Sequence, residues 1–324
     1  MDAVRLSSVY GPEQLSQISE ISEMVCPPTT KEALTENLEL MKEVEYLFGG
    51  WAMPELSQEF LDSAPNLKGV FFSAGTVKPY VSDAFWARNI VLTNAHKANA
   101  VPVAEYCVAS IILSLKFGWK FLRELRENKR WARETAEVPG CYDATVGLIS
   151  LGAIGFKTLE LLKPFKVKVL VYSTSMSQDE ANEWGAEIVG LDEIFERSDV
   201  VSLHTPLLPS TTGMIRGDHF RTMKPRATFI NTARGAVVNQ AEMIEAMRER
   251  PDLTALLDVV SPEPPEEGDE IFSVDNIHIT PHIAGSLGRE GLRLGQTAID
   301  ECKRFIAGED LLYQVVEGDL ARMA

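Results

Sequence analysis

The sequence predicts an α/β protein built from two doubly wound parallel-sheet domains. Short apolar strands alternate with helical segments along most of the chain, and this alternation is typical of parallel sheets covered by helices on both faces. The strands fall into two series separated by a long helical stretch. The second series opens on a turn of small residues, of the kind that binds phosphates. A cleft between two such domains is a common place for a small ligand to bind.

Composition limits the classes of function. The chain has 324 residues, enough for two domains of ordinary size, and 45% of them are hydrophobic and 24% charged, as in most globular proteins. The formal net charge of −16 argues against nucleic acid or an anionic membrane as a partner, because both select basic surfaces. A small anionic substrate remains compatible with this charge, since one local arginine can outweigh it.

The cysteines and the N-terminus indicate a cytoplasmic protein. The four cysteines are scattered and form no C-x-x-C pair, so we expect free thiols in a reducing compartment and neither a disulfide framework nor a metal site. The first residues lack the basic and apolar regions of a secretory signal. The longest uncharged apolar run, 106–115, is too short to span a bilayer.

The first strand series predicts the smaller domain. A long helix follows it, and Pro102 suits the first turn of that helix because proline has no N–H to donate. Apolar residues then recur at helical spacing as far as Leu122, and the charged stretch after it predicts a solvated end or an arm. The expected strands of this series, each ending in a turn, are residues 3–11, 43–50, 67–75 and 89–94.

The second strand series predicts a complete doubly wound sheet. In a parallel sheet the carboxyl ends of the strands share one edge, so polar residues at the strand ends converge there. The expected strands of this series are residues 145–152, 167–173, 199–206, 227–235, 254–260 and 277–282.

The turn after the first of these strands predicts a dinucleotide site with one altered position. Such a turn usually has three glycines, for a tight bend, for approach of the backbone to the pyrophosphate and for close packing of the helix. Gly152 and Gly155 keep the second and third roles, whereas Ser150 stands at the first. A plain tight turn is the alternative, but a strand before it and a helix after it favour an anion site.

The end of the second strand of this series does not decide between NAD and NADP. An Asp or Glu normally holds the ribose hydroxyls there, and an arginine accepts the 2′-phosphate of NADP. Ser173 stands at this place and is followed by Thr174 and Ser175, whose hydroxyls suit either form. We favour NAD, because a 2′-phosphate would meet no cation here.

Three later strands each end in an unusual polar cluster. Arg234 follows one strand, Asp258 and Glu263 follow the next, and His282 follows the last. All of them are expected at the same edge of the sheet as the phosphate turn. Core packing does not explain three such clusters at successive strand ends.

These motifs resemble the D-isomer-specific 2-hydroxyacid dehydrogenase family, over nearly the whole chain. The resemblance implies a Rossmann-type nucleotide domain, residues 99–284, inserted in a smaller flavodoxin-like substrate domain, residues 1–98 and 285–324. The chain departs from the family pattern at residues 94–99, where "NAHKAN" replaces a rigid turn. The segments that carry the resemblance are 201–215, 223–235, 257–265 and 279–285.

The resemblance also implies catalytic roles. Arg234 would bind the substrate carboxylate through its planar fork of donors. His282 would be the general acid in reduction and the base in oxidation, and Glu263 would hold its other ring nitrogen. Asp258 would contact the nicotinamide carboxamide. The alternatives are a surface salt bridge for Arg234, a solvated loop carboxylate for Glu263 and a structural role for His282.

Further residues are implied to line the two binding sites. Ala74 and Gly75 would offer backbone N–H groups to the substrate carboxylate beside Arg234 and His282. Trp51 would form a wall of the pocket or serve as an ordinary loop anchor. His204 resembles the family's histidine near the cofactor, with direct contact left open. The implied cofactor-binding residues are Ser150, Gly152, Ala153, Ile154, Ser173, His204, Thr205, Pro206, Thr232, Ala233, Asp258 and His282.

The sequence therefore predicts an NAD(P)-dependent oxidoreductase that interconverts a small 2-keto acid and the D-2-hydroxy acid. The resemblance implies a homodimer, joined through the long helix and the arm around Trp131. A catalytically weak nucleotide-sensing binding protein on the same fold is the alternative, and the Arg–Glu–His set argues against it. Formate oxidation would need a second polar residue beside the active histidine pair, which we do not find. The keto acid, the direction of the reaction and the effect of 94–99 on domain closure stay open.

Overall fold

The computed structural model describes residues 3–131 and 137–323. The chain divides into two compact units. Unit 1 comprises Met1–Asn99 and Ser286–Ala324, and unit 2 comprises Ala100–Gly285. The sequence-based boundaries lie at 98/99 and 284/285.

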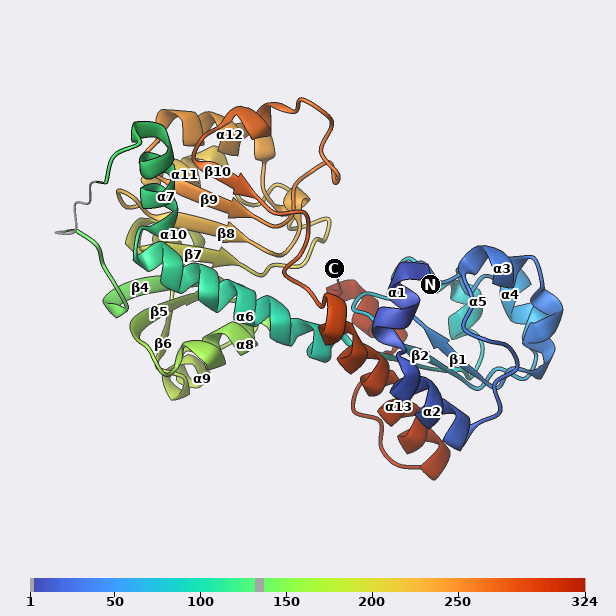
Figure 1. The fold of residues 1–324 in the computed structure, drawn as a ribbon. Helices are drawn as coiled ribbons and strands as arrows, with labels where there is room; N and C mark the ends of the chain where they lie inside the picture. The colour runs from blue at the N-terminus through green and yellow to red at the C-terminus, as the bar shows by residue number, and fades with distance from the viewer. Residues whose placement is uncertain (1–2, 132–136, 324) are drawn as a thin grey trace. The chain divides into compact units, whose positions relative to one another are not determined.

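Unit 2 contains a parallel sheet of seven strands (Figure 1). Their order is β10-β9-β8-β7-β4-β5-β6, so the direction of winding reverses between β4 and β7. This reversal confirms the doubly wound prediction for unit 2 and creates a switch point at the carboxyl ends of β4 and β7. All six expected strands are present, and the three-residue β6 is additional. The strands are β4 (Tyr142–Ile149), β5 (Lys166–Tyr172), β6 (Ala186–Ile188), β7 (Val200–Leu203), β8 (Thr228–Asn231), β9 (Thr254–Leu257) and β10 (Ile277–Ile279).

Helices cover both faces of this sheet. One face packs on α6 and α8, through residues such as Ile111 and Leu159. The other packs on α10, α11 and α12, through residues such as Phe195, Phe220 and Met243. The helices of unit 2 are α6 (His96–Leu115, which begins in unit 1), α7 (Gly118–Asn128), α8 (Ala153–Leu162), α9 (Gln178–Glu183), α10 (Leu191–Arg197), α11 (Gly217–Thr222), α12 (Gln240–Glu249), and the 3₁₀ turns η2 (Gly235–Val237) and η3 (Glu270–Ser273).

Unit 1 contains a smaller parallel sheet, with strands in the order β1-β2-β3. Residues of β2 pack on one face with α4 and α5, and on the other face with α13. The strands are β1 (Tyr46–Gly49), β2 (Gly69–Phe72) and β3 (Val91–Asn94). The helices are α1 (Ala3–Val9), α2 (Pro12–Ile21), α3 (Lys31–Thr35), α4 (Gln58–Ser63), α5 (Asp83–Trp86) and α13 (Gly291–Ala307), with 3₁₀ turns η1 (Leu38–Glu43), η4 (Gly288–Glu290) and η5 (Glu317–Arg322).

The strand expected at 3–11 is wrong, because Ala3–Val9 forms helix α1. Tertiary packing overrides the alternating pattern of this segment. A Cβ at Gly295 of α13 would lie only 2.1 Å from the Val9 carbonyl oxygen, so the two backbones touch. Without this strand, the described strands of unit 1 lie in the sheet in the order in which they occur in the chain, so the direction of winding does not reverse. The parallel α/β class is kept, and the double winding belongs to unit 2.

The expectation that Pro102 starts the long helix is also wrong, because α6 begins at His96. A proline inside a helix leaves the carbonyl four residues earlier without its usual donor. That carbonyl belongs to Ala98, and the Arg293 guanidinium donates to it at 3.2 Å. A side chain of α13 thus satisfies the group that Pro102 leaves free.

Helix α6 is long and apolar enough to cross a membrane by length and composition alone. Its most apolar window has a mean hydropathy of 1.5, and 50% of that window is buried inside the structure. Ile111 and Leu115 pack in the same apolar cluster as residues of β4. A buried core helix passes the same test, so these figures are weak evidence for a membrane span.

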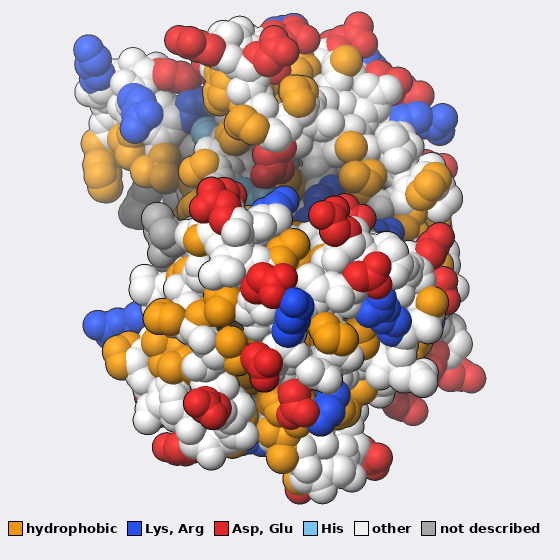
Figure 2. Space-filling model, turned by 90° about the vertical axis from the view of Figure 1, so that its right-hand side faces the viewer, with side chains coloured by type: hydrophobic (Ala, Val, Ile, Leu, Met, Phe, Trp, Pro, Cys, Tyr) orange, Lys and Arg blue, Asp and Glu red, His pale blue; other side chains and the backbone are white. Residues whose placement is uncertain are grey.

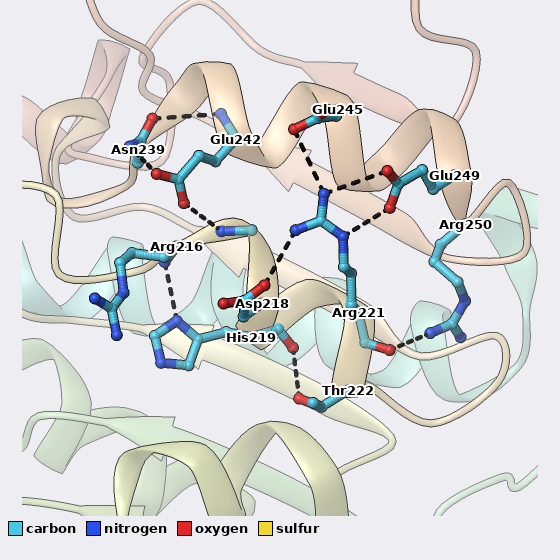
Figure 3. Close-up of polar contacts among 11 residues, drawn as sticks. Arg216, Asp218, His219, Arg221, Thr222, Asn239, Glu242, Glu245, Glu249 and Arg250 are labelled. Atoms are coloured by element: carbon cyan, nitrogen blue, oxygen red, sulfur yellow. Dashed lines mark hydrogen bonds and ion pairs between the residues drawn. The ribbon is translucent and has the colours of Figure 1, made fainter.

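Ion pairs hold α11 beside α12 (Figure 3). Arg221 of α11 lies 3.2 Å from Asp218, 3.5 Å from Glu245 and 2.7 Å from Glu249, measured between charged atoms. Arg250, just after α12, donates to the Arg221 carbonyl at 2.8 Å. Exposed pairs of this kind contribute little singly, but together they fix how the two helices lie. This matters for the site because α12 follows the loop that carries Arg234.

Charged and apolar side chains are mixed on the face of the molecule drawn in Figure 2. Acidic groups are scattered over this face among apolar, basic and uncharged ones, and no continuous basic surface forms among the residues drawn in colour.

Candidate functional site

The phosphate turn of unit 2 has a strained serine and a close helix. Ser150 has a φ of 74°, in the left-handed region that favours glycine. Its N–H donates to the Tyr172 carbonyl at 2.7 Å, which fixes the turn against β5. A Cβ at Gly155 would lie 2.2 Å from the Ser150 carbonyl oxygen, so only glycine lets α8 pack this closely. A Cβ at Gly152, the N-cap of α8, would meet no atom within 4 Å. The turn is thus open where a pyrophosphate would approach.

The end of β5 carries hydroxyls and no charge. The Ser173 Oγ accepts hydrogen bonds from the N–H groups of Ser175, at 3.2 Å, and Met176, at 3.1 Å. These bonds close a tight turn directly after the strand. Thr174 and Ser175 are exposed.

Polar atoms without partners lie at the end of β7. His204 and Thr205 are buried, and both ring nitrogens of His204 and the Thr205 Oγ1 have no hydrogen-bond partner among the described residues. Burial lowers the pKa of His204 to about 4, so the ring is neutral at pH 7. The His204 N–H donates to the Ile149 carbonyl at 2.9 Å, which places this strand end beside the phosphate turn. Buried polar atoms normally have partners, so this group fits a bound polar ligand.

Arg234 is positioned by contacts between two loops. A Cβ at Gly235 would lie 2.0 Å from the carbonyl carbon and oxygen of Val260, so the loop after β8 lies directly on the loop after β9. Asn231 holds the first loop by accepting from the Ala233 N–H at 2.9 Å and donating to the Arg234 carbonyl at 3.1 Å. The Arg234 side chain donates to the Ala233 carbonyl at 2.7 Å.

The electrostatics of Arg234 connect it to Glu263. Burial lowers the pKa of Arg234 from its ordinary value, and the charge of Glu263 acts in the opposite direction. The half-buried guanidinium therefore keeps its charge in surroundings where an anion would bind more strongly than in water.

Glu263 and His282 form the pair that the sequence predicts. The His282 Nδ1 lies 2.6 Å from the Glu263 Oε1, and the two side chains are 47% and 38% exposed. Since an ionised carboxylate only accepts, Nδ1 is the protonated ring nitrogen in this contact. The Nε2 atom has no protein partner within the described part of the chain.

Asp258 anchors the segment that carries His282. Its Oδ1 accepts from the Thr280 hydroxyl at 2.6 Å and from the Ile283 N–H at 2.8 Å, and its Oδ2 accepts from the Ala284 N–H at 2.9 Å. His282 has a φ of 52°, and its N–H donates to the Asp258 carbonyl at 3.0 Å. Both oxygens of the buried carboxylate therefore accept hydrogen bonds from the segment around His282. These bonds account for the burial of Asp258 without the expected contact with the nicotinamide carboxamide.

The structure also reveals supporting residues that the sequence analysis did not single out. Tyr106 of α6 contacts the Thr280 hydroxyl at 3.1 Å, and the Cys107 Sγ contacts the Thr232 Oγ1 at 3.2 Å. Both contacts tie α6 to strand ends of the site. Burial raises the pKa of Cys107 to about 11, so this thiol stays protonated. In a sequence, a Tyr or Cys among the apolar residues of a helix is typical of a core position. No sequence pattern therefore predicts that these two residues contact Thr280 and Thr232.

The remaining expected cofactor residues lie on the same segments of unit 2. Ala153 and Ile154 form the first turn of α8. Ile154 packs with Val103 and Ala284. The Pro206 carbonyl accepts from the Thr211 hydroxyl at 2.6 Å.

The expected substrate residues of unit 1 lie around the ends of β1 and β2. The Asn94 side chain donates to the Gly75 carbonyl at 3.0 Å, and the Ala95 N–H donates to the Ala74 carbonyl at 2.9 Å. A Cβ at Gly75 would meet no atom within 4 Å, so the backbone there is open. Trp51 packs against two apolar clusters of unit 1, which agrees with an anchoring role.

A cavity of about 760 Å³ lies in unit 1, and Ala74, Gly75 and Trp51 are not among the residues that line it. It is lined by α2, by the loop after it and by β1, with apolar side chains such as Ile18, Val25 and Phe48. It holds none of the groups described above. No group of three or more His, Cys, Asp or Glu side chains within 3–131 and 137–323 is arranged to hold a metal ion.

Comparisons with known proteins identify relatives. Residues 109–284 match the family model described as D-isomer specific 2-hydroxyacid dehydrogenase, NAD binding domain. The chain is 32% identical to the glyoxylate reductase of Thermofilum pendens over 260 residues, which are 79% of this chain and 76% of that one. It is 29% identical to the D-3-phosphoglycerate dehydrogenase of Archaeoglobus fulgidus over 254 residues, which are 78% of this chain and 48% of that one. The chain therefore spans about half the length of that relative.

A solved structure shares the fold. The D-isomer specific 2-hydroxyacid dehydrogenase from Lactobacillus delbrueckii, in its NAD-complexed form, superposes with a TM-score of 0.78 at 21% identity, covering 94% of this chain and 98% of that one. The predicted cofactor, NAD, agrees with the domain that the family model describes. The open turn at Gly152 and the unpartnered atoms of His204 and Thr205 fit such a group.

Proposed function

Because the chain belongs to the D-isomer-specific 2-hydroxyacid dehydrogenase family, we propose that it is a cytoplasmic oxidoreductase that interconverts a small 2-keto acid and its D-2-hydroxy acid. The observation that carries this proposal is the His282–Glu263 contact of 2.6 Å beside Arg234. A protein that only binds nucleotide has no evident need for this set.

Arg234 would bind the carboxylate of the substrate. Its guanidinium is planar and presents parallel donors that match a carboxylate, and one of its nitrogens is held by the Ala233 carbonyl. The neighbouring backbone is fixed by Asn231 and by the contact at Gly235. The substrate would thereby be oriented with its carbonyl group toward His282.

His282 would exchange a proton with the substrate oxygen. Nδ1 faces Glu263, so in reduction the ring, protonated on both nitrogens, would give its Nε2 proton to the carbonyl oxygen, and in oxidation the neutral ring would take a proton from the hydroxyl at Nε2. Glu263 fixes the tautomer and the ring orientation, and Asp258 fixes the backbone around His282. The nicotinamide, when bound, supplies or accepts the hydride.

The test is turnover with a matched pair of loop variants. Purified protein is mixed with NADH or NADPH and a panel of 2-keto acids that includes glyoxylate, hydroxypyruvate, pyruvate and bulkier acids, and the absorbance of the reduced nicotinamide is followed. We expect turnover with at least one acid, a large loss in Glu263→Gln, and wild-type rates in Glu267→Gln, because Glu267 is exposed in the same loop. Cofactor binding without turnover across the whole panel would overturn the proposal in favour of a nucleotide sensor.

Unit 2 also supports the expected homodimer. Leu122 of α7 is 58% exposed, Tyr142 of β4 is 72% exposed and Trp131 is 85% exposed. None of the residues of α7 is buried, although the helix is amphipathic. Large exposed apolar side chains of this kind mark an interface. Light scattering after gel filtration should give twice the chain mass, and Leu122→Glu should lower it. A monomer at micromolar concentration would exclude this assembly.

A further inference from the structure

The free edge of the sheet in unit 1 lies in the cavity of about 760 Å³. All four residues of β1 line this cavity, together with residues 22–30, which connect α2 to α3. We propose that the cavity binds an extended peptide segment of a partner protein, apolar and basic, which pairs with β1 as a further strand of the sheet. The proposal is independent of the proposed function, because Ala74, Gly75 and Trp51 do not line the cavity and the nucleotide site belongs to unit 2.

Strand β1 is an edge because a strand expected from the sequence is absent. The segment 3–11 was expected as a strand of this domain, and Ala3–Val9 forms helix α1 instead. Among the described residues, β1 therefore has β2 on one side and no strand on the other. An edge strand presents a row of unpaired N–H and C=O groups that another strand can bond.

The backbone of β1 shows which groups are free. The Ser73 N–H donates to the Gly49 carbonyl at 2.9 Å, so the backbone groups of Gly49, and of Leu47 two residues earlier, face β2. The N–H and C=O groups of Tyr46 and Phe48 consequently face away from β2. No backbone hydrogen bond from residues 3–131 or 137–323 reaches these four groups. They favour a ligand that has backbone N–H and C=O groups of its own.

The walls of the cavity are apolar, and part of this apolar surface is exposed. Met24 is 42% exposed, Val25 is 40% exposed and Ile306 of α13 is 46% exposed, and all three line the cavity. Ile18 and Met41 line it as well and are buried. Exposed apolar side chains that surround a concave site mark a place where a partner binds. A strand with apolar residues at alternate positions would present all of them to one side.

The charged residues of the cavity indicate the charge of the peptide. Glu23, Glu43 and Glu45 line it, against Lys31 as the one cation among the described lining residues. Glu45 pairs with Lys68, which lies outside the lining. This excess of acidic groups favours lysine or arginine in the peptide. A fatty acid fits less well, because its carboxylate would meet the glutamates and its chain would leave the edge of β1 unbonded.

The experiment uses a synthetic peptide probe and the purified full chain. The probe is a dye-labelled Val-Lys-Val-Thr-Val-Lys peptide, and its fluorescence anisotropy is followed as protein is added. Two further probes carry N-methyl groups, one on the three valine nitrogens and the other on the three remaining nitrogens. In a strand, the N–H groups of alternate residues face the same side, so only one of the two sets faces β1. One methylated probe should bind like the parent, and the other should bind at least about tenfold more weakly.

A matched pair of protein variants tests the place of binding. Val25→Ser should weaken binding of the parent probe by about fivefold to tenfold, because it removes an apolar wall of the cavity. Val316→Ser is the control, since Val316 is 53% exposed in the same unit and does not line the cavity. Circular dichroism establishes that both variants are folded.

Each alternative occupant gives a different result. Two methylated probes that bind equally would overturn the proposal, because the cavity would then take apolar groups without strand pairing. A Val25→Ser variant with a lower mass in light scattering would assign the edge to a second copy of the chain, and would also overturn it. The absence of saturable binding of the parent probe up to about 1 mM would show that the edge accepts no such strand.

Discussion

The two ends of the nucleotide unit achieve their shape in opposite ways. At the phosphate turn, Ser150 takes a left-handed conformation that glycine would take more readily, and its side chain is tolerated. At the loop of Arg234, the close approach of Val260 excludes every side chain at Gly235. The first position is set by a backbone angle, which a serine can adopt at a modest cost. The second is set by the volume between two backbones, which nothing but glycine can share.

This contrast shows which positions of unit 2 can carry a side chain and which cannot. In the phosphate turn, a side chain is tolerated at Ser150, where only the backbone angle is set, whereas Gly155 is confined to glycine by the Ser150 carbonyl. The loops that carry Arg234 and His282 are connected by the backbone contact at Gly235, the hydrogen bonds of Asp258 and the contact of Glu263 with His282. The chemistry of the site therefore depends on all three residues. The following experiments test this contrast.

The largest effect is expected from His282→Ala. General acid–base catalysis contributes typically about 10²–10⁴-fold, so kcat should fall by this factor, which is far more than any change in the dissociation constant of NADH. Steady-state rates with the best keto acid, and a fluorescence titration of NADH, measure the two quantities. A variant that keeps more than half of its activity would remove the distinction between the two ends, because His282 would then be structural.

The next effect is a pH dependence of stability that comes from His204. Its folded pKa of about 4 lies below the ordinary value of 6.5, so the unfolded chain binds the proton first as the pH falls. The contribution of neutral His204 to the free energy of unfolding is therefore complete above pH 6.5. It is lost between about pH 6.5 and 4, and the loss amounts to about 3 kcal/mol. Urea unfolding at a series of pH values, without cofactor, should show a shallower decline in His204→Asn. Equal slopes in the two proteins would show that His204 does not carry the effect.

A smaller effect is expected from Gly235→Ala. The new methyl group must displace the Val260 backbone, and overpacking of this kind costs typically about 1–3 kcal/mol. The shift should also move Arg234, so the KM for the keto acid should rise. The matched control is Gly318→Ala, whose Cβ would meet no atom within 4 Å. Thermal unfolding and steady-state kinetics compare them, and equal values would disprove the close contact.

The smallest effect, of opposite sign, is expected from Ser150→Gly. Left-handed backbone costs a residue with a side chain about 1–2 kcal/mol, and glycine would relieve this strain in the folded state. Glycine also gives the unfolded chain more conformational freedom, which offsets about 0.5–1 kcal/mol of the gain. A net stabilisation of about 0.5–1 kcal/mol should appear in urea unfolding. If the variant is less stable, the Ser150 side chain itself contributes to the turn.

The predictable part of the molecule is the part whose signals are local. The nine confirmed strands of β1–β5 and β7–β10 are short apolar runs ended by turn residues, and these runs are visible in the sequence. The pairing of Glu263 with His282 was inferred from the resemblance and is present in the structure. The segment 3–11 was mispredicted because Gly291 and Gly295, far along the chain, create the surface on which it folds as a helix. Likewise, the anchoring of Ala284 by Asp258 depends on distances that no periodicity encodes.

The proline inside α6 has a consequence for how the sequence can evolve. Pro102 removes one donor from the helix, and Arg293 supplies another to the same Ala98 carbonyl, although the two residues lie far apart in the chain. A change of Pro102 to alanine would restore the helical hydrogen bond to the Ala98 carbonyl, so Arg293 would no longer be needed as its donor. Loss of Arg293 with Pro102 kept would leave that carbonyl without a protein donor. The two positions should therefore vary together among descendants of this sequence, as a pair coupled through a backbone atom that belongs to neither.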